Sequence, residues 1–172
     1  MRKKNPVLEE EILTVSARLM RERGIGSFSL RSLSSELGIS LGNLYTYYSS
    51  KDLILFSILE RKSDILVRMV SQINVTTLEE YIKALSDAFR EQYTSETGPM
   101  MASIGHHDRE AVRKMNRVLD TLDVVISDAL QGYGVTEDSL FRASFIRRNI
   151  FDSIRYNLDM DKTIELLVSA LS

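Results

Sequence analysis

Residues 28–53 read Phe-Ser-Leu-Arg-Ser-Leu-Ser-Ser-Glu-Leu-Gly-Ile-Ser-Leu-Gly-Asn-Leu-Tyr-Thr-Tyr-Tyr-Ser-Ser-Lys-Asp-Leu. Ser29 and Ser40 each stand at a position typical of a helix N-cap, and Gly38 between the two segments can form a tight turn. The second segment is small, polar and aromatic, whereas a helix on a solvated surface would normally be charged. The pattern predicts two short helices, ending near Leu37 and Tyr48, followed at once by the start of another helix.

Two short helices around a glycine turn are the ingredients of a helix-turn-helix. Such a motif needs apolar residues that lock the two helices at a fixed angle, and a second helix whose outward face fits the major groove, about 12 Å wide. We predict that this lock consists of Leu33, Leu37, Ile39 and Leu44. On the second helix, Gly42 would let the backbone approach DNA closely.

Polar side chains on and beside the second helix can reach DNA. Ser40 and Asn43 can form hydrogen bonds with bases or phosphates, and Tyr45 and Tyr47 carry hydroxyls on rigid arms. Lys51, at the start of the following helix, can meet a phosphate. Taken as one ordered set, these residues indicate a DNA-binding surface.

Charge is distributed unevenly along the chain. Residues 1–51 carry eight lysines and arginines against five acidic residues, a net charge of +3, and residues 52–172 carry 14 against 19, a net charge of −5. Nucleic-acid affinity depends on a local basic surface rather than on a basic protein. The basic N-terminal third is compatible with DNA binding, although an excess of this size also arises by chance.

Three segments resemble the DNA-binding domain of the TetR family of bacterial and archaeal transcriptional regulators. They are Ser29-Leu-Arg-Ser-Leu, Leu37-Gly-Ile-Ser-Leu-Gly-Asn-Leu-Tyr-Thr-Tyr-Tyr-Ser-Ser-Lys-Asp-Leu53, and Leu19-Met-Arg-Glu-Arg-Gly24 at the end of the preceding helix. The resemblance covers about residues 8–56. It implies a helix-turn-helix DNA-binding domain over residues 1–52 and a helical regulatory and dimerisation domain over residues 53–172.

The resemblance also implies roles for single residues. Ser29 would meet a backbone phosphate, aided by the helix dipole, and Arg31 would contact a guanine. Leu41 and Gly42 occupy the base-reading end of the recognition helix. Leu41 departs from the polar or basic residue often found there: it can touch a thymine methyl group but cannot form a hydrogen bond. Most of the direct sequence readout would therefore rest on Arg31.

Phosphate contacts are implied for Asn43, Tyr45, Tyr47 and Lys51. Because one of the near-adjacent tyrosines must pack against the first helix, we expect Tyr48 to be buried.

Several residues of this domain keep alternative interpretations. Ser29 and Lys51 could simply cap and solvate helix ends. Ser34 stands where the family usually has an alanine, which is a tolerable change at a tightly packed position. The basic segment Arg2-Lys3-Lys4 either adds phosphate or minor-groove contacts or is an uninvolved tail.

Helical periodicity runs through nearly the whole chain, and eight glycines and two prolines among 172 residues leave little material for β-hairpins. We predict an all-α fold of about nine helices. Outside the motif, the predicted helices cover about residues 8–23, 51–72, 78–89, 100–104, 108–130, 137–157 and 161–171. The pair Gly98-Pro99 is predicted to interrupt the chain, and Thr136 to open the helix that follows it.

The resemblance implies that the last two helices, over residues 137–157 and 161–171, form a homodimer. The first of them carries apolar residues on more than one side, including Leu140, Phe141 and Phe145, which is more than one core-facing stripe requires. That excess suits a self-complementary interface, and an ordinary two-sided core helix is the alternative.

A small apolar or amphipathic effector would fit the family. Candidate ligand-binding residues around Gly98-Pro99 are Phe89, Tyr93, Met100, Met101, Ile104 and His107. Methionines and aromatic residues at helical spacing are more often core than part of a ligand site. The chain is also short for the family, which favours a small pocket or none.

Catalysis and metal binding find little support in the sequence. The chain has no cysteine, and no paired carboxylates or nucleophile–base arrangement can be argued. The run His106-His107-Asp108 has metal-ligating residue types, but adjacent residues rarely face one ion. We therefore predict no enzyme activity, no cofactor and no metal.

Glu9-Glu10-Glu11 occupies the place of a signal peptide's apolar region, and no apolar run approaches membrane-spanning length, so a cytoplasmic protein is expected.

These observations predict a sequence-specific DNA-binding transcriptional regulator. Its partners would be double-stranded DNA and a second copy of the chain, and it would be a ligand-responsive repressor acting on a pseudo-palindromic operator. The alternative is a helical protein-interaction scaffold or co-activator of the same fold that takes no small-molecule effector.

Overall fold

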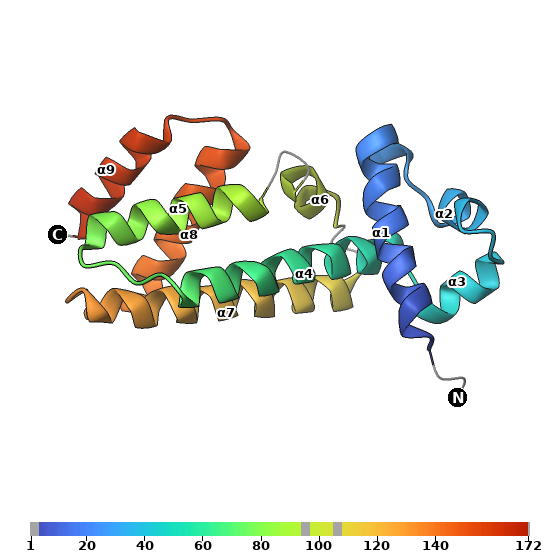
Figure 1. Ribbon diagram of the computed structural model, residues 1–172, viewed down its shortest axis with the longest axis horizontal. Helices are drawn as coiled ribbons and strands as arrows, with labels where there is room; N and C mark the ends of the chain where they lie inside the picture. Colours follow the sequence, from blue (N-terminus) through green and yellow to red (C-terminus); the bar gives the residue numbers. More distant parts are fainter. Residues whose placement is uncertain (1–3, 94–96, 105–107, 172) are drawn as a thin grey trace. The chain divides into compact units, whose positions relative to one another are not determined.

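The computed structural model describes residues 4–93, 97–104 and 108–171. Over these residues the chain folds into nine α-helices and one short 3₁₀ helix, with no strand, which confirms the predicted all-α class (Figure 1). In chain order the elements are α1 (Pro6–Arg23), η1 (Ile25–Ser27), α2 (Leu30–Glu36), α3 (Leu41–Tyr47), α4 (Lys51–Ser71), α5 (Leu78–Gln92), α6 (Thr97–Ser103), α7 (Arg109–Gly132), α8 (Ser139–Arg155) and α9 (Met160–Leu171).

The chain divides into two compact units. Unit 1 consists of Met1–Glu60 and Pro99–Met115, and unit 2 consists of Arg61–Gly98 and Asn116–Ser172. Helix α4 is continuous and contributes to both units. Unit 1 therefore contains the N-terminal helices together with most of α6 and the beginning of α7.

The core of unit 1 locks α2 to α3. Leu33 and Leu44 have no exposed surface, and the partly buried Leu37 and Ile39 pack against the same cluster. Helix α2 contacts both α1 and α3, and these three helices lie together at the blue end of the chain in Figure 1. Gly38 has a φ of 64°, a left-handed conformation that glycine adopts without steric cost, so the turn between α2 and α3 requires it.

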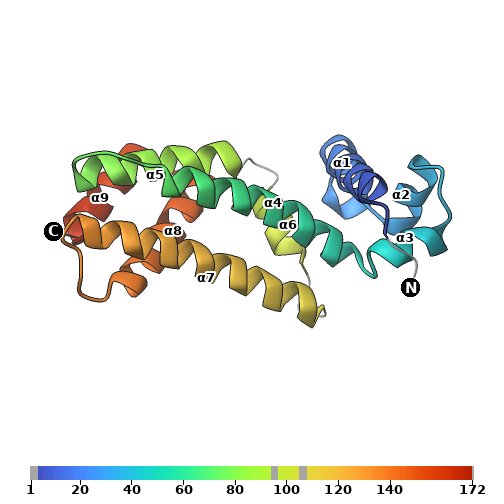
Figure 2. The same cartoon turned by 60° about the horizontal axis from the view of Figure 1, so that its bottom comes forward.

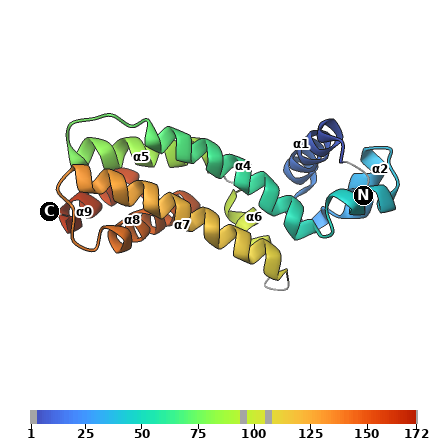
Figure 3. The ribbon, with the colours of Figure 1, turned by 90° about the horizontal axis from the view of Figure 1, so that it is seen from below.

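Unit 2 is built around α5, whose buried face includes Tyr81, Ile82, Leu85 and Phe89. Helix α9 packs against α5 and α8, and Figure 2 shows these three helices grouped together. Helix α7 lies alongside the second half of α4 in Figure 3. The apolar face of α9 is thereby used inside the protomer.

Two local features differ from the sequence predictions. Gly98 and Pro99 lie within the first turn of α6 instead of interrupting the chain. Proline is tolerated there because the amide groups of a first turn have no partner inside the helix. Helix α8 begins at Ser139 after Asp138, whose φ is 50° and whose side chain makes no capping hydrogen bond, so Thr136 does not open this helix.

Candidate nucleic-acid interface

Serine caps begin both helices of the motif. The hydroxyl of Ser29 accepts a hydrogen bond from the amide of Ser32 at 3.1 Å, and that of Ser40 accepts one from the amide of Asn43 at 3.1 Å. The Ser32 hydroxyl in turn accepts from the amide of Ser29 at 3.2 Å, which completes a capping box. Ser29 and Ser40 are exposed, so each serine both caps its helix and lies at the surface.

The outward face of α3 carries most of the predicted contacts. Gly42, Asn43 and Tyr45 are exposed, and 51% of the surface of Tyr45 is accessible. A Cβ atom added to Gly42 would meet no other atom within 4 Å. Leu41 is partly buried against the core of unit 1, so it packs inward as well as lying at the start of the recognition helix.

Tyr48 is buried and Tyr45 is exposed, as predicted. Tyr48 is 6% exposed, and its hydroxyl lies 3.5 Å from a carboxylate oxygen of Glu9 on α1. The side chain of Tyr48 therefore packs between the helices and leaves Tyr45 at the surface.

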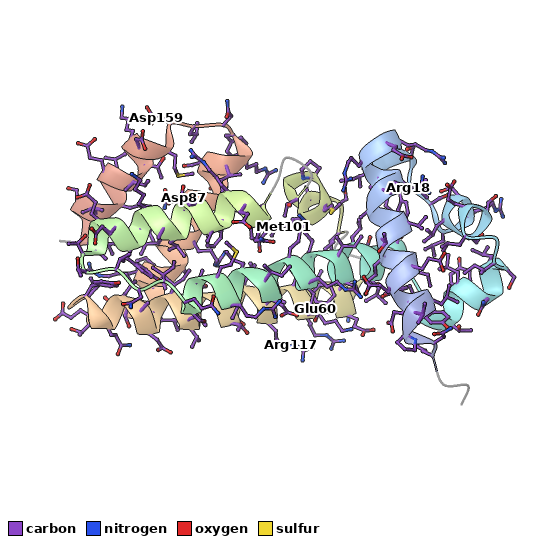
Figure 4. All side chains as sticks on the ribbon, in the orientation of Figure 1. Arg18, Glu60, Asp87, Met101, Arg117 and Asp159 are labelled. Atoms are coloured by element: carbon purple, nitrogen blue, oxygen red, sulfur yellow. The ribbon has the colours of Figure 1, made fainter. Side chains whose placement is uncertain are left out.

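Arg31 lies on the exposed surface of α2. Nearby arginines are neutralised: Arg18 pairs with Glu22 and Glu36, and Arg23 pairs with Glu36. The Arg18 guanidinium is the main cause of the lowered pKa of the Glu36 carboxyl. Figure 4 shows Arg18 on α1. In the described part of the chain Arg31 takes part in no ion pair, so its positive charge is available for an external acceptor.

Ser34, on the inner side of α2, is 7% exposed and donates a hydrogen bond from its hydroxyl to the carbonyl oxygen of Arg31 at 3.0 Å. The buried hydroxyl is therefore satisfied, which explains why serine is tolerated at this packed position.

Lys51 and Tyr47 are both engaged inside unit 1. The Lys51 ammonium donates to the carbonyl oxygen of Ile25 at 2.6 Å and lies 5.8 Å from the ring centroid of Phe28. The Tyr47 hydroxyl accepts from the amide of Asn5 at 3.0 Å. Lys51 thus has a structural role that its sequence position alone did not reveal, and a phosphate contact by Lys51 stays a prediction.

Lys4 also contacts α3, and the sequence analysis did not connect it to this helix. Its ammonium donates to the carbonyl oxygen of Tyr47 at 3.1 Å and lies 5.9 Å from the centroid of the Tyr47 ring. The two residues are separated by 43 positions in the chain, so no local pattern could have indicated the contact.

The predicted ligand-binding residues fall into two cores. Phe89 and Tyr93 are buried in unit 2, where their rings stack with centroids 5.5 Å apart. The Tyr93 hydroxyl shares a hydrogen bond with that of Ser63, and burial raises the pKa of Tyr93.

The other ligand candidates lie in unit 1 or outside the described chain. Met100, Met101 and Ile104 pack in the core of unit 1, and Met101 is labelled on α6 in Figure 4. His107 lies outside the described residues. The effector site stays a prediction.

An open groove of about 410 Å³ lies between α7 and α8 in unit 2. Its lining combines carboxylates with apolar side chains: Asp120, Asp123, Val124, Leu140, Phe141 and Ser144. Arg147 on α8 pairs with Asp123 on α7 through two contacts, of 2.5 and 3.0 Å. Leu140 and Phe141 are 54% and 71% exposed, so one wall of the groove is an uncovered apolar surface.

Within residues 4–93, 97–104 and 108–171, no group of three or more histidine and acidic side chains is arranged to hold a metal ion. Among the same residues, no helix combines the length and apolar character needed to cross a membrane.

Residues 12–58 match the sequence profile of the bacterial regulatory proteins of the tetR family. No curated protein is significantly similar to the chain in sequence.

Solved structures match along nearly the whole chain. A transcriptional regulator from Rhodococcus sp. Rha1 has a TM-score of 0.74 at 16% identity, with 95% of both chains covered. A TetR transcriptional regulator from Legionella pneumophila has a TM-score of 0.64 at 16% identity, with 100% of both chains covered. The multidrug binding protein EbrR, crystallised with imidazole, has a TM-score of 0.69 at 13% identity, covering 95% of this chain and 94% of its own.

The match over residues 12–58 contains α2, the glycine turn and α3, and the remaining helices follow the arrangement of the regulators of known structure. Residues 12–58 therefore carry the sequence signature of the bacterial regulatory proteins of the tetR family, and the chain as a whole shares the fold of transcriptional regulators of known structure.

Proposed function

We propose that the protein is a sequence-specific DNA-binding transcriptional regulator that acts as a homodimer on a pseudo-palindromic operator. The observation that carries the proposal is the exposed face of α3, where Gly42, Asn43 and Tyr45 lie uncovered while Leu44 on the opposite side is fully buried. The recognition helices of the two protomers would enter successive major grooves, about 34–36 Å apart.

Roles on DNA follow from chemistry and exposure. Arg31 reads a guanine, because its guanidinium can donate two hydrogen bonds to the base edge and is not committed to an acid in unit 1. Ser29, Ser40, Asn43 and Tyr45 bind phosphates and fix the register of the motif on the duplex.

Replacing Arg31 by alanine should relax specificity more than it weakens DNA binding in general. Loss of one bidentate base contact costs about 1–3 kcal/mol of discrimination, or about 5- to 150-fold. The measurement is fluorescence anisotropy with the selected operator and with scrambled DNA of equal length, at several salt concentrations. Arg117→Ala is the control, because Arg117 is an exposed arginine on α7 (Figure 4).

Two outcomes would reject this assignment. If Arg31→Ala weakens operator and scrambled DNA equally, Arg31 binds phosphate and does not read a base. If the wild-type protein shows no preferred sequence and no salt dependence, the protein-interaction scaffold replaces the DNA-binding regulator.

A homodimer is supported by the apolar surface of α8. Leu140, Phe141 and Phe145 are 54%, 71% and 42% exposed, while Ala143, Ile146 and Ile150 on the same helix are buried. A helix that is apolar on two sides needs a second partner, and a second copy of the chain would supply the same surface across a two-fold axis.

Placing a charge on this surface should shift the protein toward monomer. We expect Phe141→Asp to weaken dimerisation at least tenfold while leaving helix content unchanged, because Phe141 is 71% exposed and its loss opens no cavity. Sedimentation velocity over a concentration series measures this, with Val7→Asp on α1 as the control, since Val7 is 72% exposed in unit 1. If Phe141→Asp and the wild type sediment equally, the dimer interface lies elsewhere on the protein.

We further propose that the protein represses transcription and that a small apolar or amphipathic ligand releases it from DNA. Bound dimers would occlude RNA polymerase, and an effector would favour a dimer shape that fits DNA less well. EbrR, which has a similar fold, is a multidrug binding protein crystallised with imidazole, and this supports a ligand-binding role by analogy.

A hydrogen-bonded pair at the start of α4 could transmit such a change. The Ser50 hydroxyl accepts from the amide of Leu53 at 3.1 Å and donates to Asp108 at 2.6 Å. Asp108 also accepts from the amides of Glu110 and Ala111 at the start of α7, at 3.1 Å each. The Ser50 hydroxyl is the main cause of the lowered pKa of Asp108. The first turns of α4 and α7 are therefore linked through the Ser50 hydroxyl and the Asp108 carboxylate.

A further inference from the structure

The recognition helix carries no charge of its own. Helix α3 reads Leu-Gly-Asn-Leu-Tyr-Thr-Tyr, and its last turn contains no basic residue. The C-terminal end of a helix bears a partial negative charge, and its last carbonyl groups have no partner inside the helix. Docked against DNA, such an end would lie unfavourably near phosphates unless a cation neutralised it.

Lys4 supplies a cation at that end. Its ammonium donates to the carbonyl oxygen of Tyr47, the last residue of α3, at 3.1 Å and lies 5.9 Å from the Tyr47 ring centroid. An ammonium has three donors, so two remain after the bond to the Tyr47 carbonyl. Lys4 is exposed, which leaves these donors accessible.

The neighbouring residue holds the backbone of Lys4 in place. The amide of Asn5 donates to the Tyr47 hydroxyl at 3.0 Å, and the Asn5 side chain caps α1 by accepting from the amide of Val7 at 3.0 Å. Residues 4 and 5 are thus fixed to α1 on one side and to α3 on the other. Much of the entropy cost of ordering this segment is met on folding, before any ligand binds.

Lys51 does not fill the same role in unit 1. Lys51 is only partly exposed, and its ammonium donates to the Ile25 carbonyl at 2.6 Å and lies over the Phe28 ring. In the described part of the chain, Lys4 contacts α3 through both a hydrogen bond and a cation–π contact.

We propose that Lys4 binds the DNA backbone at the C-terminal end of the recognition helix, and that Tyr47 positions it there. The inference rests on the proposed DNA-binding function and assigns a phosphate contact to a residue outside the helix-turn-helix. Tyr47 acts in two ways: its carbonyl and ring hold the ammonium, and its hydroxyl holds the amide of Asn5.

The salt dependence of DNA affinity tests the contact. Each phosphate neutralised adds about 0.9 to the slope of log affinity against log salt, so Lys4→Met should lower that slope by about 0.9. It should weaken operator and scrambled DNA by the same factor, several-fold at moderate salt. Lys4→Arg should restore the slope, and Lys83→Met, at an exposed lysine on α5, should leave it unchanged.

The positioning role of Tyr47 is tested by a double-mutant cycle. Tyr47→Phe keeps the ring and the carbonyl but removes the acceptor for Asn5, so Lys4→Met should have a smaller effect on affinity in that background. An unchanged slope for Lys4→Met overturns the contact with DNA. Fully additive effects of the two substitutions overturn the positioning role.

A measurement without DNA separates this inference from the proposed function. In NMR spectra of the DNA-free protein, the ring protons of Tyr47 should shift in Lys4→Met and stay in place in Lys83→Met. If wild-type protein shows no salt-dependent DNA binding, the proposed function fails and the DNA contact of Lys4 fails with it. If wild-type protein binds but the Tyr47 ring does not respond to Lys4→Met, only the inference fails.

Discussion

Replacing Gly42 by leucine should lower operator affinity about a hundredfold or more without destabilising the protein. A Cβ atom at this position meets nothing within 4 Å in the folded chain, so the protein itself has room for a side chain. Leucine is also a better helix former than glycine, which is less favourable than alanine by about 0.8–1 kcal/mol in a helix interior. On DNA, however, a four-carbon side chain would hold α3 away from the groove. Two lost contacts with DNA of about 1.4 kcal/mol each account for a hundredfold loss.

The test pairs DNA titration with chemical denaturation of the same samples. Gly26→Leu is the matched control, because Gly26 on η1 likewise has no atom within 4 Å of an added Cβ and lies outside α2 and α3. We expect wild-type affinity for the Gly26 variant and a higher or unchanged free energy of unfolding for the Gly42 variant. Wild-type affinity of Gly42→Leu would mean that this face of α3 does not approach DNA.

Gly38 and Gly42 show what the sequence could and could not distinguish. Both glycines belong to the predicted motif, and the local pattern was sufficient to place the caps at Ser29 and Ser40 and the turn at Gly38. The structure separates their roles, because only Gly38 has a positive φ, of 64°, that the fold itself requires. Gly42 has space around it, so the fold itself does not require glycine there, and only an external partner could impose that requirement.

The features that the sequence did not predict depend on contacts between distant segments. The hydrogen bond between Lys4 and Tyr47 joins residues 43 positions apart, and that between Ser50 and Asp108 joins residues 58 positions apart. Helical periodicity reports which face of a helix is apolar, but it does not identify the helix that covers that face. For the same reason it could not assign Met100 to the core of unit 1.

The C-terminal helices illustrate the same limit. The sequence predicted apolar residues on two sides of α8, and the structure has both a buried side and an exposed one. In α9 the apolar residues Met160, Ile164 and Leu167 are buried, and Leu166 is 63% exposed. The exposed apolar surface therefore lies mainly on α8, with Val124 of α7 beside it in the groove lining.

Breaking the ion pair beneath that groove should be the most destabilising single substitution among those considered. We expect Arg147→Met to lower the free energy of unfolding by about 3–5 kcal/mol, because it leaves the carboxylate of Asp123 buried without its partner. The side chains of Arg147 and Asp123 are 18% and 10% exposed, so water can replace little of the lost interaction. Urea denaturation followed by circular dichroism measures the change. Glu110→Gln, which breaks the exposed pair with Lys114, should cost about 1 kcal/mol or less.

The double variant Asp123→Leu/Arg147→Met distinguishes a structural from a functional reason for the ion pair. Replacing a buried ion pair by apolar residues of similar volume is often neutral or stabilising, so the double variant should recover most of the stability lost in Arg147→Met. If stability returns and the double variant dimerises as the wild type does, the pair serves mainly to hold α8 against α7. If stability returns but the double variant sediments as a monomer, the interface also requires a fixed orientation of α8. The two-point contact between Arg147 and Asp123 provides that orientation, whereas an apolar pair has no directional preference and cannot replace it.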